Sequence, residues 1–375
     1  MTQAEADALA RMVRALVASV DRLDMGFGSH GEEMRLDVRL AVLPDSPLSP
    51  GPQPDFDRAL RLTRVLPAGG NFLVAIAMDM SPQFEIFQDF YVLNARREAE
   101  KMGDRGEAYA QWFEGYLGMK DIWALPLAAS YRFADEGMVA HAVMHSPDAQ
   151  TDADRLVAML EGLSDADMGL TLTPLPAAEL GGAKIHRWSI SFDEETMTGL
   201  AGTPTSPQLS GMGRMQAEQV TAILQKIVPG LSDAAAGDHV FLVADDDPTH
   251  LQGMIEASGK GGKPVPQVAK VSEAAGPGVQ EVVTGDLMAI LKWVTAFMDE
   301  ADQEEMAVVM ENPIPFDGAY TIDGDRFGFA MNMDVKAMQN MIRALDEMDV
   351  DEMSGDMKDY SDESREEIEE KMDDD

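Results

Sequence analysis

Two stretches of sequence decide the fold: DMGFGSHGEEMRLDVRL at Asp24–Leu40 and DGAYTIDGDRFGFAMNM at Asp317–Met333. They align without a gap, with Gly31 falling on Gly324 and apolar residues at alternate positions of the second half. A glycine at a hairpin tip supplies the positive φ that a tight turn needs, and alternation is typical of a strand with one buried face. Each stretch therefore predicts a β-hairpin followed by a helix.

A third stretch, SYRFADEGMVAHAVMH at Ser130–His145, has the same pattern with Gly137 at its turn. Repetition of one strand–turn–strand unit is typical of duplicated scaffolds. We therefore expect an α+β fold, in which antiparallel sheets built from hairpins carry helices on one face, arranged as two duplicated lobes.

The composition along the chain suggests where these lobes begin and end. Residues 199–213 (GLAGTPTSPQLSGMG) are rich in Gly, Pro and Ser, which is typical of a linker. We expect an N-terminal lobe at 1–198, the linker at 199–213 and a C-terminal lobe at 214–345. Residues 346–375 contain 16 acidic and 3 basic residues and are expected to form an acidic disordered tail.

The charge of the chain limits its partners. The 375 residues carry a net charge of −38, while 45% of them are hydrophobic, which is enough for a core. Such a surface repels nucleic acid and anionic lipid, and it also repels itself, so salt should stabilise the fold. No apolar run approaches the roughly 18 residues of a transmembrane helix, so we expect no transmembrane segment.

The chain contains no cysteine. This excludes disulfides, thiolate nucleophiles and cysteine metal sites. It slightly favours an exported protein, with its signal removed, over a cytoplasmic one, although a cytoplasmic protein without disulfides would have the same composition.

The most concentrated set of potential metal ligands follows the apolar stretch 240–243. Asp245, Asp246, Asp247 and His250 could hold Ca²⁺ or Mg²⁺ at the end of a strand. The alternative is that Asp247 caps a helix that starts at Pro248. Helix capping explains the proline, whereas a metal site does not.

Two other histidines, His141 and His145, have the spacing that chelates zinc on a helix. Their surroundings alternate and predict a strand instead. Four residues of strand span roughly 13 Å, so these two rings should not share a metal.

Aromatic residues are concentrated in Phe84–Tyr116, within a segment, Gln83–Met119, that is expected to be mostly helical with a break near Gly103 and Gly106. They could line an apolar pocket that also borders the strands 34–42 and 327–333, or they could pack as ordinary core.

These observations favour a non-enzymatic binding or structural protein, exported or associated with the cell envelope, whose partner is an unknown protein or an apolar small molecule. No G-x-S-x-G or P-loop motif is present. The alternatives are a carrier of an apolar ligand between sheet and aromatic helices, and a metal-dependent enzyme around Asp245–His250.

Overall fold

The structure is a computed structural model that describes residues 3–30, 33–103, 106–134, 137–165, 170–180, 182–192, 230–245, 247–295, 310 and 312–347. The expected linker at 199–213 and residues 348–375 of the expected acidic tail lie outside the described residues, as does Asp246. The two lobes expected at 1–198 and 214–345 are therefore described only in part, and this division of the chain stays a prediction.

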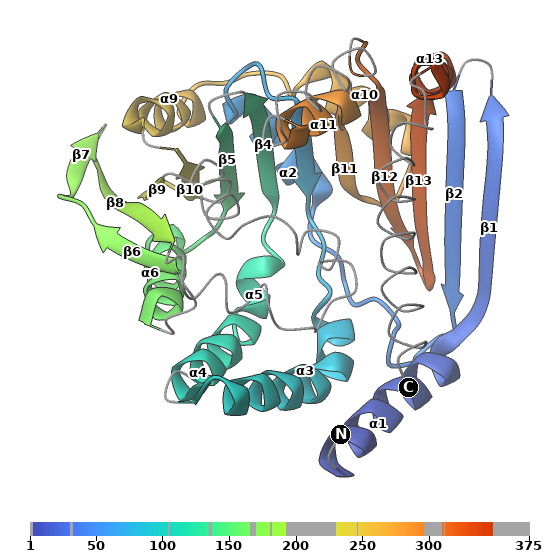
Figure 1. The fold of residues 1–375 in the computed structure, drawn as a ribbon, viewed down its shortest axis with the longest axis horizontal. Helices are drawn as coiled ribbons and strands as arrows, with labels where there is room; N and C mark the ends of the chain where they lie inside the picture. The colour runs from blue at the N-terminus through green and yellow to red at the C-terminus, as the bar shows by residue number, and fades with distance from the viewer. Residues whose placement is uncertain are drawn as a thin grey trace, which may run out of the picture.

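All described strands belong to one thirteen-stranded antiparallel sheet, which runs across the view in Figure 1 from β6–β8 at the left to β1 at the right. The strand order is β1-β2-β13-β12-β11-β3-β4-β5-β10-β9-β8-β6, and β7 also pairs with β8. The strands are β1 Val20–His30, β2 Glu33–Val42, β3 Phe72–Ile76, β4 Leu127–Ala134, β5 Gly137–His145, β6 Leu170–Pro174, β7 Ala178–Leu180, β8 Ala183–Phe192, β9 Gly230–Ala236, β10 His239–Ala244, β11 Val279–Asp286, β12 Pro315–Asp323 and β13 Arg326–Asp334.

The helices lie before, between and after these hairpins, which confirms the expected α+β class. None of the helices in the described part of the chain combines the length and apolarity needed to cross a bilayer. They are α1 Gln3–Ser19, α2 Phe56–Leu62, the 3₁₀ helix η1 Thr63–Val65, α3 Ser81–Lys101, α4 Gly106–Leu117, α5 Lys120–Trp123, α6 Ala149–Asp165, α9 Pro248–Ser258, α10 Pro266–Ala275, α11 Leu287–Thr295 and α13 Val335–Glu347.

The two aligned hairpins lie side by side in this sheet, because β2 pairs with β13. Asp37 pairs with Ala330, the residue with which it is aligned. Both hairpins also have the same internal register, since Gly26 pairs with Asp37 in the first and Ala319 pairs with Ala330 in the second. The hairpins are thus related by a local two-fold axis, but two duplicated lobes are not confirmed, because both hairpins occupy one end of one continuous sheet.

Helices cover both faces of the middle of the sheet. On one face, α2, η1 and α9 pack around Phe241 and Val143, and α2 and α10 cover β3, β11 and β12. On the other face, α5 and α6 contact Met144 and Val240. Helices were expected on one face; they cover both because β5 and β10 are apolar at consecutive positions, which point to opposite faces of a strand.

Candidate metal centre

Three side chains from three elements meet on the face of the sheet that α9 covers: His141 of β5, Asp245 after β10, and His250 of α9. Potential ligand atoms of the three lie within 4.8 Å of one another. His141 pairs with Val243 across the β5–β10 ladder, and Asp245 follows Val243 by two residues. Residues two apart on a strand point to the same face, so the pairing brings His141 and Asp245 together.

His250 reaches the same point because of where α9 begins. Asp247 is the N-cap of α9, and its side chain accepts a hydrogen bond from the Thr249 N–H at 2.8 Å. His250 is therefore in the first turn of the helix, where side chains lean back toward the N-terminus. Its Nδ1 contacts Oδ2 of Asp245, whose Oδ1 accepts the Asp247 N–H at 3.0 Å.

The His141 side chain is buried with one ring nitrogen unsatisfied. The side chain is 6% exposed; its Nδ1 lies 3.5 Å from the Ser130 hydroxyl, and its Nε2 has no hydrogen-bond partner among the residues that the structure describes. This Nε2 lies 4.0 Å from Oδ2 of Asp245. A buried polar atom without a partner destabilises a fold by roughly 1–3 kcal/mol, so its occurrence beside a carboxylate and a second imidazole needs an explanation.

The electrostatics keep His141 neutral. Burial, with smaller effects from His250 and Arg132, lowers its pKa to about 4. Burial also raises the pKa of Asp245, and the hydrogen bond from His250 opposes that rise. At neutral pH His141 therefore presents an unprotonated ring nitrogen, which is the form that binds metal.

The structure divides the residues that the sequence singled out. Asp245 and His250 lie together, whereas Asp247 caps α9 and has no ligand role among the described contacts. His141 and His145 both lie on β5 and belong to separate clusters, as their strand spacing predicted.

The second cluster contains His145, Asp238 and His239. The Asp238 carboxylate contacts His145 Nδ1 at 3.3 Å and His239 Nδ1 at 2.8 Å, and Arg58 lies 2.7 Å from His145 Nε2. The cationic Arg58 disfavours a second cation here, and Asp238 is 58% exposed. Both ring nitrogens of His145 have partners, and in the described part of the chain no side-chain atom of this cluster is buried without one.

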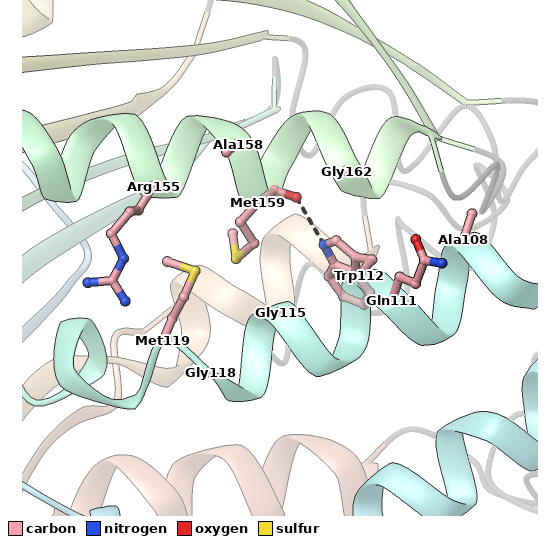
Figure 2. Close-up of a pocket in the computed structure, with 10 residues that line it drawn as sticks. All are labelled: Ala108, Gln111, Trp112, Gly115, Gly118, Met119, Arg155, Ala158, Met159 and Gly162. Atoms are coloured by element: carbon pink, nitrogen blue, oxygen red, sulfur yellow. Dashed lines mark hydrogen bonds between the residues drawn. The ribbon is translucent and has the colours of Figure 1, made fainter.

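A cleft of about 520 Å³ lies elsewhere, between α4 and α6 (Figure 2). Trp112 of α4 faces Met159 of α6 and donates a hydrogen bond to its carbonyl at 3.0 Å. Arg155 at one end of the cleft is already paired with Asp121 at 2.7 Å. The cleft presents apolar surface of the aromatic helix α4, which a carrier of an apolar ligand would need. The charge of Arg155 in this cleft is already neutralised by Asp121.

No known protein family, curated protein or solved structure significantly matches the chain. The three-residue cluster must therefore be interpreted from its own chemistry. The sequence did not indicate that His141 lies beside Asp245, which depends on the pairing of β5 with β10, or that Ser130 lies beside His141, which depends on the pairing of β4 with β5. The spacing of His141 and His145 drew attention to His141, but the strand pattern around it does not say which strand lies next to it.

Proposed function

We propose that the protein is a non-enzymatic binding protein that holds a divalent transition-metal ion between His141, Asp245 and His250, with Zn²⁺ as the best candidate. The observation that carries this proposal is the buried Nε2 of His141, which has no partner in the described part of the chain. A metal ion coordinated by this nitrogen would remove the unsatisfied polar atom and neutralise the buried carboxylate of Asp245.

The ligand types favour zinc over the Ca²⁺ or Mg²⁺ that the sequence suggested. Ca²⁺ and Mg²⁺ prefer oxygen ligands, and Ca²⁺ takes six to eight of them. Two imidazoles and one carboxylate suit Zn²⁺ and other first-row transition metals instead. Ser130 adds a hydroxyl beside His141 Nδ1, the position from which a neighbouring group orients a metal-binding imidazole.

The burial of the cluster supports binding rather than turnover. The side chains of His141 and Asp245 are 6% and 5% exposed, and that of His250 is 32% exposed. A small ion can enter beside His250, whereas a substrate would need a cleft at the metal. The cleft between α4 and α6 is lined by other residues, so a metal-dependent enzyme is the less favoured alternative.

The test is isothermal titration of the full, metal-stripped chain with Zn²⁺, followed by Ca²⁺ and Mg²⁺. We expect one Zn²⁺ site that neither Ca²⁺ nor Mg²⁺ occupies. Replacing a metal ligand removes most of the affinity, so His141→Ala should abolish binding at this site.

The matched control is His145→Ala, which removes a histidine from the same strand but from the other cluster. This variant should bind Zn²⁺ as the wild type does. Zinc binding that survives His141→Ala, or that is lost equally in both variants, would contradict the proposal.

A further inference from the structure

Among the described strands, β1 is an edge strand without a partner on its outer side. It occupies one end of the strand order, and within the part of the chain that the structure describes it pairs with β2 alone (Figure 1). Every residue from Val20 to Ser29 is exposed. Leu23, Met25 and Phe27 are 58%, 70% and 72% exposed and lie at alternate positions, so they form one apolar row on one face of the strand.

The equivalent strand of the second hairpin is fully paired. Under the alignment of the two hairpins, the row on β1 corresponds to Phe316, Gly318 and Tyr320 of β12. Those residues pair on their outer side with β11, where Phe316 lies opposite Gly285. The second hairpin thus pairs with a further antiparallel strand, β11, on its outer side. The outer edge of β1 in the first hairpin has no such strand among the described residues.

We infer that the outer edge of β1 pairs with the β1 of a second copy of this chain, in antiparallel orientation about a two-fold axis at Met25. The two sheets would then join into one continuous sheet. Exposed strand edges are templates for such pairing, and two-fold dimers are the commonest homo-oligomers.

The sequence of β1 is complementary to itself in this register. Met25 meets Met25 of the second copy, and Leu23 meets Phe27, so the apolar row is continuous across the axis. On the opposite face, Asp24 meets Gly26 of the second copy. Each charged side chain on that face therefore lies opposite a glycine. This arrangement avoids like charges directly opposite each other, which destabilise a sheet.

Neighbouring registers lack this match. An axis at Asp24 places the two Asp24 carboxylates directly opposite each other. An axis at Gly26 places Leu23 opposite the polar Ser29 on the face of the apolar row, and it places Arg22 opposite His30 on the other face. The axis at Met25 is the register that keeps apolar residues together and separates like charges.

The net charge makes this association weak and dependent on salt. Each copy carries −38, so two copies repel each other at low ionic strength. The Debye length falls from about 10 Å at 0.1 M salt to about 3 Å at 1 M, which removes most of that repulsion. A single pair of strands also buries little surface area. Transient interfaces bury less than about 1,200 Å² in total, and this interface belongs to that small class.

The first test is sedimentation velocity of the full chain across a concentration series at about 0.1 M and about 1 M NaCl. We expect monomer at low salt and a growing dimer fraction at high salt. Met25→Lys places two cations opposite each other on the axis and should abolish the dimer. Val17→Lys is the matched control: Val17 is 73% exposed on α1, outside the strand that pairs, and this variant should still form the dimer.

The second test uses the absence of cysteine in the chain, which makes a single introduced thiol unambiguous. Met25→Cys should form an intermolecular disulfide on oxidation at high salt, because directly opposed residues have Cα atoms about 4.5–5.5 Å apart. Phe27→Cys should not, because the two Phe27 positions lie about 13 Å apart across the axis. A monomer at high salt at every concentration, a dimer that survives Met25→Lys, or equal cross-linking of both cysteine variants would each overturn the inference.

Discussion

The glycine immediately before β11 offers a quantitative test of how tightly the sheet is packed. Gly278 has φ +80°, and a Cβ added there would lie 2.4 Å from the carbonyl oxygen of Ile322 on β12. The Ile322 N–H donates to the Gly278 carbonyl at 2.7 Å, so this part of β12 cannot move away without breaking that hydrogen bond. Gly278→Ala therefore combines an unfavourable backbone conformation with a steric clash against backbone.

The two contributions can be estimated separately. A left-handed conformation destabilises a residue with a Cβ by roughly 1–2 kcal/mol. Forcing extra volume into a packed site adds about 1–3 kcal/mol. We therefore expect Gly278→Ala to lower the free energy of unfolding by about 2–5 kcal/mol.

The control is Gly324→Ala at the tip of the β12–β13 hairpin. Gly324 has φ +58°, but a Cβ there would meet nothing within 4 Å. This variant should lose only the conformational part, about 1–2 kcal/mol. Urea unfolding measures both values, with the slope against denaturant expected to be unchanged. Equal losses in the two variants would refute the reasoning, because they would show that the Ile322 carbonyl moves freely.

Two further predictions concern charge. Asp247→Ala removes the N-cap of α9 and should weaken the fold slightly while leaving the Zn²⁺ affinity unchanged, whereas Asp245→Ala should abolish Zn²⁺ binding. Titration calorimetry of the two variants distinguishes the helix cap from the metal ligand. A loss of Zn²⁺ affinity in Asp247→Ala would contradict this assignment. Raising NaCl from about 0.1 to about 1 M should raise the melting temperature, because screening weakens the repulsion of the −38 net charge; an identical melting curve at both concentrations would count against it.

Local features of the fold could be predicted from the sequence because they depend on short-range chemistry. The alternation in 34–42 and 327–333 indicates strands, and Gly324, with φ +58°, lies at a hairpin tip as expected. The start of α9 follows from Asp247 and Pro248, whose cap geometry the structure confirms. The break in the aromatic helical segment also falls where Gly103 and Gly106 predicted it, between α3 and α4.

Long-range pairing could not be predicted in the same way. Any half-buried strand edge can pair with any other, so nothing local says that β2 lies beside β13 or that β5 lies beside β10. The candidate metal centre depends on the second pairing. Asp245 and His250, five residues apart, could be predicted as neighbours, whereas His141 could not, because its position depends on β5 joining β10.

The strand order also constrains how the chain can fold. β11–β13 lie between β2 and β3, and β9–β10 lie between β5 and β8, so strands from late in the chain separate groups of strands from early in it. A nascent chain that has not yet reached residue 230 therefore leaves the edges of β2, β3, β5 and β8 without their final neighbours. Non-local pairing of this kind slows folding, and unpaired edges are prone to aggregate, so the early part of the chain depends on the rapid arrival of the rest.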